Sequence, residues 1–348
     1  MTTVLGAIRI HRAYSWRRGT GGTFAADQTL GIDGFLTRQA TRLVTLAGIE
    51  HSFARAQQVL QEFCGWQVDD EVIRQTTHAQ ARRAAAERAD RGDAPRFARA
   101  SGAIEVLIDA GKGNTLAGWR EVKLGLFCKR EAGPPATPAE WAERDLPAPT
   151  IRTVRAAIEG CGEFAQRLRA ESDRLGVTEA SALTVLGDGA EWIWNLTADH
   201  WPQATGVLDI YHALEHVSDA VKAVFGVGTE ATTTQTQAGR VALLTGGKAG
   251  LDQWLARAWG AIPAGVSSDP WIELAAYLAK HPTRLNYADR LAEGRSIGSG
   301  AVEGTIKQEV NVRMKRTGAR WRVEHVGPLV ELRAFSHTPE WATLWTAA

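Results

Sequence analysis

Four acidic residues occupy positions where a folded chain could gather them around one substrate. Asp109, Asp188 and Asp209 each end an apolar run, and Glu303 lies in a glycine-rich segment that leads into a basic stretch. Carboxylate oxygens are the ligands that hard divalent cations prefer. Two such ions about 4 Å apart can neutralise a phosphodiester, activate an oxygen nucleophile and stabilise the leaving oxygen. The chemistry that these residues favour is therefore phosphoryl transfer.

Three of the four carboxylates form the predicted metal site. We expect Asp109 to bridge two Mg²⁺ (or Mn²⁺) ions and Asp188 and Glu303 to hold one ion each, although the sequence leaves the individual assignments open. A strand-end Asp alone is more often a turn or helix cap. Glu303 alone could simply pair with Lys307, four residues later on a surface helix. The joint pattern favours the metal-site interpretation.

The elements expected around these residues would bring Asp109 and Asp188 together. An apolar strand ends at Asp109, a turn is expected at residues 111–114, and an alternating segment, a proline-rich loop and a third strand at residues 150–157 follow. Helices then alternate with two further strands that end at Asp188 and Asp209. This order is the order of the ribonuclease H-like fold. Acids at the ends of its neighbouring parallel strands converge on one edge of the sheet.

The predicted fold class is α/β: a ribonuclease H-like mixed sheet flanked by helices. Residues 1–100 are expected to form a helical DNA-binding region, whose first thirty residues are an arm or loop. Residues 101–216 and 295–348 form the catalytic core in this interpretation. Residues 217–294 are a helical insertion, after which Glu303 returns to the core on a late helix.

A candidate helix-turn-helix lies in the N-terminal region. Two helical patterns are separated by residues 65–68, and Asp69 is positioned to cap the second. If the motif reads DNA, Arg74, Gln75, Thr77 and His78 would face a major groove. A plain helical hairpin is the commoner alternative.

A basic segment follows Glu303. Val302, Ile306 and Val310 recur every four residues as a stripe expected to be buried, on a helix that starts near Ser299. The residues expected to contact a phosphate backbone, with Trp321 as a stacking surface, are Lys307, Arg313, Lys315, Arg316, Arg320 and Arg322. The alternative is an amphipathic surface helix.

Composition narrows the class of protein. The chain has 348 residues, 44% of them hydrophobic, and a formal net charge of +1, so nucleic-acid binding must rest on local basic clusters. No apolar run approaches the ~20 residues that cross a bilayer, and no secretory signal is visible, so a cytoplasmic protein with no membrane partner is expected. The three cysteines include no CxxC pair, and we expect ordinary buried thiols.

Four sequence blocks carry a family resemblance. They are IDAGKGN with GWREVKLGLF, then VLGDGAEWIWN, then DIYHALEH, and finally IGSGAVEGTIK with NVRMKRTGARW. In this order, over about residues 30 to 335, they resemble bacterial insertion-sequence DDE transposases, particularly the Kra group related to Mutator-like elements. The resemblance matches Asp109, Asp188 and Glu303 to the catalytic triad. It matches Asp209 and His212 to a D-x-x-H block and implies that His212 lies at the edge of the active site; a buried hydrogen-bonding histidine is the alternative.

The resemblance also implies a function. It implies a transposase that binds the terminal inverted repeats of its own element as double-stranded DNA, then cleaves and joins them to target DNA. A homodimer on DNA and a nucleoid-associated location in a bacterial cytoplasm are expected by the same analogy. Two alternatives stay open: a ribonuclease H-like nuclease without strand transfer, and a catalytically inactive, transposase-derived DNA-binding protein.

Overall fold

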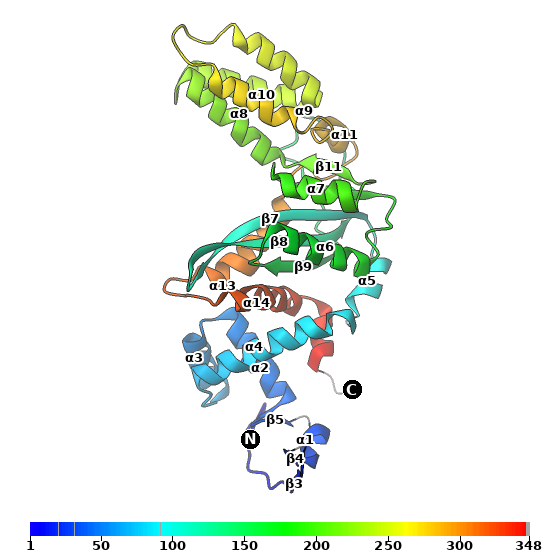
Figure 1. Cartoon of the computed structure of the whole chain (residues 1–348), viewed down its shortest axis with the longest axis vertical. Helices are drawn as coiled ribbons and strands as arrows, with labels where there is room; N and C mark the ends of the chain where they lie inside the picture. The colour runs from blue at the N-terminus through cyan, green and yellow to red at the C-terminus, as the bar shows by residue number, and fades with distance from the viewer. Residues whose placement is uncertain (20, 31, 91, 346–348) are drawn as a thin grey trace.

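A computed structural model of the chain describes residues 1–19, 21–30, 32–90 and 92–345. The protein has a mixed α/β fold, which confirms the coarse fold class. Figure 1 shows an elongated molecule in which a central sheet lies between a bundle of helices at one end and the N-terminal region at the other.

The central sheet has five strands in the spatial order β11-β10-β7-β8-β9. The first three in the sequence, β7 (Ala103–Thr115), β8 (Gly118–Arg130) and β9 (Ile151–Ala157), pair antiparallel. The other two, β10 (Leu183–Gly187) and β11 (Thr205–Leu208), extend the sheet parallel to β7. The predicted meander followed by parallel strands is therefore confirmed.

The prediction of a turn at residues 111–114 is wrong. These residues continue β7 and pair with β8 as far as Thr115, opposite Gly118. Gly111 is present for another reason: a Cβ atom there would lie 2.9 Å from Cγ2 of Ile306 and 3.3 Å from Cγ1 of Val310. The glycine permits a close approach between β7 and a helix, rather than a reversal of the chain.

Helices cover both sides of the sheet (Figure 1). On one side lie α6 (Cys161–Leu175) and α7 (Glu191–His200), whose Leu168 and Ile193 side chains pack against Gly125 and Gly187. On the other lie α12 (Gly300–Thr305), η2 (Ile306–Asn311), α13 (Val312–Met314) and α14 (Val323–Ser336). The sheet is therefore buried on both faces.

The helix after Ser299 contains an unexpected π-helical segment, η2. The predicted stripe is buried: Val302, Ile306 and Val310 are at most 6% exposed, and Met314, four residues further, is fully buried. An α-helix turns about 40° too far every four residues to keep such a stripe aligned. The wider π turn offsets this drift and keeps Ile306, Val310 and Met314 against β7. A strict four-residue apolar spacing thus explains the local geometry.

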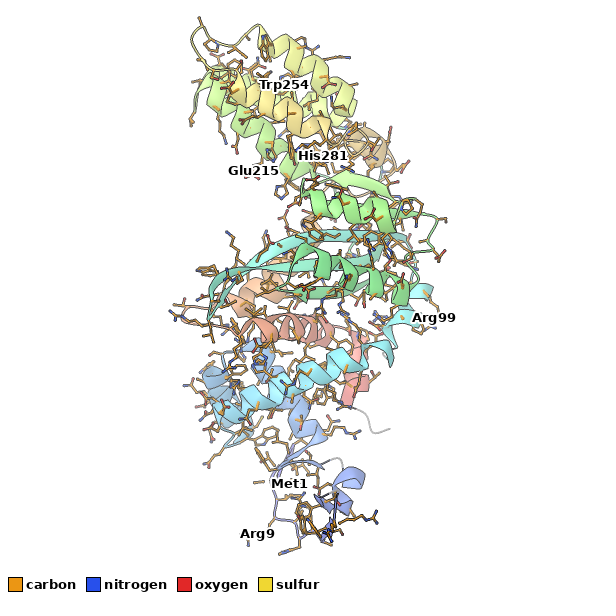
Figure 2. The ribbon with its side chains drawn as sticks, viewed as in Figure 1. Met1, Arg9, Arg99, Glu215, Trp254 and His281 are labelled. Carbon is orange, nitrogen blue, oxygen red and sulfur yellow. The ribbon has the colours of Figure 1, made fainter. Side chains whose placement is uncertain are left out.

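The segment predicted as an insertion is helical. It contains α9 (Glu230–Trp259), α10 (Asp269–Ala279) and α11 (Tyr287–Ala292), and Figure 2 labels Trp254 and His281 within it. α8 (Ile210–Phe225) runs from the sheet into this bundle and crosses the expected boundary at residue 217 without a break.

The N-terminal region is only partly as expected. Instead of an arm or loop, the described part of the first thirty residues contains β1 (Thr2–Thr3), β2 (Gly6–Ala7), β3 (Tyr14–Arg17), β4 (Gly21–Phe24) and α1 (Ala25–Leu30). The short strands β5 (Ile32–Asp33) and β6 (Leu36–Thr37) follow, then the helices α2 (Arg38–Glu50), α3 (Phe53–Cys64), α4 (Asp70–Ala86), η1 (Glu87–Asp90) and α5 (Asp93–Arg99). The chain closes with η3 (Pro339–Trp345).

The helical hairpin α3–α4 is confirmed, but its predicted reading face is not. Asp69 accepts a hydrogen bond from the Glu71 amide, and Gly65 ends α3 in the left-handed conformation, φ +68°. Thr77 is fully buried and His78 is 5% exposed, because α4 packs on α2 through Gly48, where a Cβ atom would lie 2.0 Å from Oγ1 of Thr77. Thr77 and His78 therefore serve packing, and the prediction that they face a major groove is wrong.

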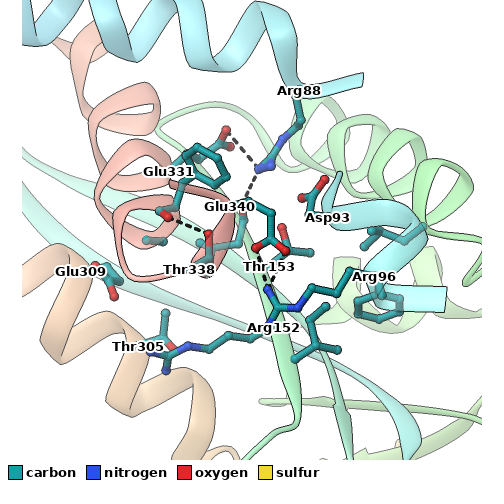
Figure 3. A pocket seen from close by; sticks show the side chains of 16 residues that line it. Arg88, Asp93, Arg96, Arg152, Thr153, Thr305, Glu309, Glu331, Thr338 and Glu340 are labelled. Carbon is teal, nitrogen blue, oxygen red and sulfur yellow. Dashed lines mark hydrogen bonds and ion pairs between the residues drawn. The ribbon is translucent and has the colours of Figure 1, made fainter. Parts of the chain in front are cut away.

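A network of charged side chains, most of them buried, joins the N-terminal helices, β9 and α14 (Figure 3). Arg88 pairs with Glu331 at 3.3 Å, Arg155 pairs with Glu331 at 3.0 Å, and Arg96 pairs with Glu340 at 2.6 Å. The cavity between them has a volume of about 20 Å³, enough for about one water molecule. These charges therefore hold elements together and do not form a ligand site.

Two further expectations concern the described residues. None of the helices in this part of the chain is long and apolar enough to span a bilayer. Cys128 is buried, but Cys64 and Cys161 are exposed, so the expectation of three buried thiols is wrong for two of them.

Candidate active site

The register of the sheet places three aspartates side by side. Ile108 pairs with Gly187, and Gly187 pairs with Leu208, so the residues that follow are Asp109, Asp188 and Asp209. Side chains alternate between the two faces of a strand. Asp109 is two residues before Gly111 and therefore projects to the face covered by η2 and α12, the helix that carries Glu303.

Each predicted ligand is held by local hydrogen bonds. Asp109 accepts from the Ala110 amide at 2.6 Å, and Asp188 accepts from the Ala190 amide at 2.8 Å. Glu303 accepts from the Ser299 hydroxyl at 3.2 Å and pairs with Lys307 at 3.7 Å. The last contact is the surface pair that the alternative interpretation expects, and both partners are solvent-accessible.

The three carboxylates interact electrostatically. Burial, together with the negative charges of Asp188 and Glu303, raises the pKa of Asp109 to about 6, against the lowering effect of the Ala110 hydrogen bond and of His212. Asp109, Asp188, Glu303 and His212 therefore share one neighbourhood. Such a concentration of negative charge favours a bound cation.

Asp209 differs from the other acids because it is fully buried and acts on the backbone. Its Oδ1 accepts from the amides of Tyr211 and His212, and its Oδ2 accepts from the Ser299 amide at 2.6 Å. One carboxylate thus joins the start of α8 to the start of α12. Asp209 fixes the two helices that carry His212 and Glu303.

His212 lies near the carboxylates on the first turn of α8. Its side chain is 42% exposed and its Nδ1 lies 3.8 Å from Glu215. A buried hydrogen-bonding histidine, the alternative to a residue at the edge of the active site, does not fit this exposure.

Tyr277 reaches the same region from the helical bundle, although in the sequence it is only a lone tyrosine in an amphipathic helix. A Cβ atom on Gly189 would lie 2.5 Å from the Tyr277 hydroxyl, so the ring packs directly after Asp188. Burial and the charges of Asp188 and Asp209 raise the pKa of Tyr277 to about 12. Its hydroxyl has no hydrogen-bond partner among the described residues.

The donors suit a hard divalent cation in type, because all three are carboxylates. Their side chains are not arranged around one point. Within the described ranges, no group of three or more His, Cys, Asp or Glu side chains is arranged to hold a metal ion. Instead, Asp109 and Asp188 turn towards neighbouring amides and Glu303 towards Ser299.

The basic residues predicted to bind DNA fall into two groups. Lys307, Lys315, Arg320 and Arg322 are exposed, and Arg316 and Arg74 are partly exposed. Arg316 donates to the Glu50 carbonyl at 2.8 Å, and Arg74 pairs with Glu71 at 2.5 Å. These six remain candidates for a phosphate backbone.

The prediction that Arg313 contacts a phosphate backbone is wrong. It is 2% exposed, donates to the Gly48 carbonyl through Nε and Nη2, and stacks between the rings of Phe53 and Trp321 at 4.8 and 4.5 Å. Through these contacts Arg313 ties the late basic segment to the N-terminal helices. It does not reach a phosphate backbone on the surface.

An aromatic and basic pocket opens beside Arg313. It has a volume of about 330 Å³ and is lined by Arg74, His78, Trp321, Arg322 and His325, among others. The rings of His78 and His325 stack at 4.1 Å, and burial and the His325 charge lower the pKa of His78 to about 3. Trp321, predicted as a stacking surface, is only 5% exposed, so that prediction is wrong.

Comparisons with known proteins add no identification. No model of a protein family matches the chain, and no curated protein sequence matches it. The assignment of function therefore depends on the geometry described above.

Proposed function

We propose that this chain is a DDE-type DNA transposase with a ribonuclease H-like core, which cleaves and joins the ends of its own element. The observation that carries the proposal is the position of Asp109 and Asp188 directly after paired residues of adjacent parallel strands, on the side of the sheet from which Glu303 raises the pKa of Asp109. The strand order β9-β8-β7-β10-β11 supports the fold assignment.

Asp109, Asp188 and Glu303 would hold two Mg²⁺ or Mn²⁺ ions. When bound, such ions polarise the scissile phosphate and stabilise the charge that develops on the attacking and leaving oxygens. The roles of the other residues follow from their contacts. Asp209 fixes the helix starts that carry Glu303 and His212, and the exposed basic residues Lys307, Lys315, Arg320 and Arg322 would orient the DNA backbone.

The substrates would be the terminal inverted repeats of the element and a target duplex. Two ends must be held together for joining, so we expect a homodimer on DNA and a location at the bacterial nucleoid. A nuclease without strand transfer is the second candidate, because hydrolysis would need the same three carboxylates.

A strand-transfer assay tests the proposal. Precleaved DNA ends from the flanking repeats are incubated with the protein, Mn²⁺ and a second duplex. Joined products are expected. Cleavage without joined products would favour the nuclease, and binding without either product would favour an inactive DNA-binding descendant.

A further inference from the structure

A third cavity lies beside the acidic cluster, at a place that the proposed function does not use. It has a volume of about 320 Å³, within the range of pockets that bind small ligands. Its walls come from the proline-rich segment between β8 and β9, represented by Trp141 and Arg144, from Tyr211 at the start of α8, and from Ser296 and Gly300 before and within α12. It therefore adjoins the two helices that bear His212 and Glu303.

Two residues that line the cavity have a buried polar atom without a partner. Trp141 is 8% exposed and Ser296 is 2% exposed. The indole Nε1 of Trp141 and the hydroxyl of Ser296 have no hydrogen-bond partner among the described residues. Buried donors and acceptors are nearly always paired in folded proteins. Both atoms are closed to solvent, so they belong to the wall behind the open surface of the cavity and not to the surface that a ligand would touch.

The cavity is also positively charged. Arg144 lines it, donates to the Arg295 carbonyl at 2.7 Å, and makes no ion pair in the described part of the chain. Burial lowers the pKa of Arg144, which reflects a desolvated guanidinium. Arg240 lies over the Trp141 ring at 5.9 Å, whereas Arg130 is already paired with Glu105. An anionic group would be stabilised beside Arg144.

An exposed aromatic ring completes the site. The ring of Tyr211 lies 5.7 Å from that of Trp141, at an interplanar angle of 51°, and Tyr211 is 56% exposed. Gly298 keeps the loop close to this ring, because a Cβ atom there would lie 3.1 Å from Cε2 of Tyr211. An exposed tyrosine held in place can stack on a planar ligand at a low cost in conformational entropy.

We propose that this cavity binds one unstacked nucleotide of a DNA strand, with its base against Tyr211 and Trp141 and its phosphate at Arg144. The inference rests on the proposed function and deepens it. A nucleotide held there would keep the strand out of the double helix next to Asp109, Asp188 and Glu303. Base stacking on an aromatic ring is tolerant of sequence, so the pocket would act on any base.

Binding of two DNA duplexes tests the inference. One duplex is blunt, and the other carries a short single-stranded 3′ overhang with 2-aminopurine at its first unpaired position. Stacking of one base on an aromatic ring corresponds to about a tenfold gain in affinity, so the wild type should prefer the overhang by about that ratio. Tyr211→Ala should bring the ratio close to one and remove the change in 2-aminopurine fluorescence.

One further variant controls for the loss of an exposed ring in general, and a second tests the contact of Arg144 with the phosphate. Trp259→Ala removes a similarly exposed ring, 49% exposed, at the end of α9, and should keep the preference. Arg144→Gln should weaken the preference for the overhang. The same proteins are titrated with dAMP and with inorganic phosphate. We expect dAMP to compete with the overhang and inorganic phosphate not to compete.

The outcomes separate the inference from the proposed function. An equal overhang preference in the wild type and Tyr211→Ala overturns the inference. Cleavage and joining without any overhang preference overturns the inference and leaves the transposase standing. If no DNA is bound, both fail, and dAMP binding that Tyr211→Ala abolishes would then identify a site for free nucleotides instead of a DNA strand.

Discussion

At the scale of single residues, the site depends on which carboxylates are free to act. Asp109, Asp188 and Glu303 interact through their charges, whereas Asp209 is fully occupied by three backbone amides. The four acids look equivalent in the sequence, since each follows an apolar or glycine-rich run. Only the hydrogen bonds that join the start of α8 to the start of α12 separate the positioning residue from the candidate ligands.

The first prediction concerns Asp209. In Asp209→Asn the amide nitrogen cannot accept a hydrogen bond, so either Ser299 or the pair Tyr211 and His212 loses its acceptor. An unpaired buried donor costs about 1 to 3 kcal/mol, which should appear in the free energy of unfolding by urea. Asp219→Asn, at a largely exposed position on α8, is the control and should be neutral. Equal stability of the two variants would refute the positioning role.

The second prediction concerns His337. Its hydrogen bonds to Glu309 and Glu50 raise the pKa of its imidazole to about 9, against the effect of burial. The stabilisation is therefore fully present below 6.5, the ordinary pKa of a histidine, and is lost as the pH rises through about 9. Thermal unfolding should show the wild type losing stability between these values, and His337→Gln should remove that dependence. A wild-type melting temperature that is flat across this window would contradict the prediction.

At the scale of elements, the sequence predicted the order of the strands and helices better than it predicted the contacts between them. Apolar periods located the five strands and the helices between them, because these periods follow directly from alternation and helical pitch. The glycines of residues 111–114 suggested a turn. The sequence does not show whether a glycine permits a close approach between two elements or a reversal of the chain. The four-residue spacing that accompanies the π turn was also visible in the sequence. An α-helix was expected there, because only the packing on β7 shows that the helix widens to keep these residues aligned.

The third prediction compares two glycine-to-alanine substitutions that should change the stability of the fold in opposite directions. Gly111→Ala places a Cβ atom against Ile306 and Val310, and such overpacking should destabilise the fold by about 1 to 3 kcal/mol. Gly304→Ala lies on the exposed side of α12 with no atom within 4 Å of the new Cβ, and should stabilise by up to about 1 kcal/mol. Urea unfolding measures both changes. A loss of stability on Gly304→Ala, or none on Gly111→Ala, would contradict the packing described here.

At the scale of the whole molecule, the N-terminal helices and the late basic segment form one packed unit. Arg313 connects them through Gly48, Phe53 and Trp321. The charge pattern predicted Arg313 as a DNA contact, since exposure cannot be read from a run of arginines and lysines. Where the N-terminal helices pack was equally invisible in the sequence, because it depends on contacts between residues 265 positions apart.

The fourth prediction follows from this division of the basic residues. Combined alanine substitution of Lys307, Lys315, Arg320 and Arg322 should reduce the slope of log affinity for DNA against log salt by up to about 3.6, since each phosphate contact contributes about 0.9. Fluorescence anisotropy between 50 and 200 mM salt, roughly the range over which such contacts weaken, gives the slope. A control with Lys222, Lys248, Arg257 and Lys280 of the helical bundle changed to alanine should keep it. If the first variant keeps the wild-type slope, these residues do not bind the backbone.

The central claim is that three carboxylates perform metal-dependent chemistry on DNA. The most direct measurement is Mn²⁺-dependent cleavage of DNA that carries the flanking repeats, by the wild type, Asp188→Asn, Glu303→Gln and the exposed control Glu273→Gln. We predict cleavage at the element ends by the wild type and the control, and a fall of at least about a hundredfold in both site variants at unchanged melting temperature. Cleavage that survives in the site variants, or a wild type that binds these ends and never cuts them, would contradict the account.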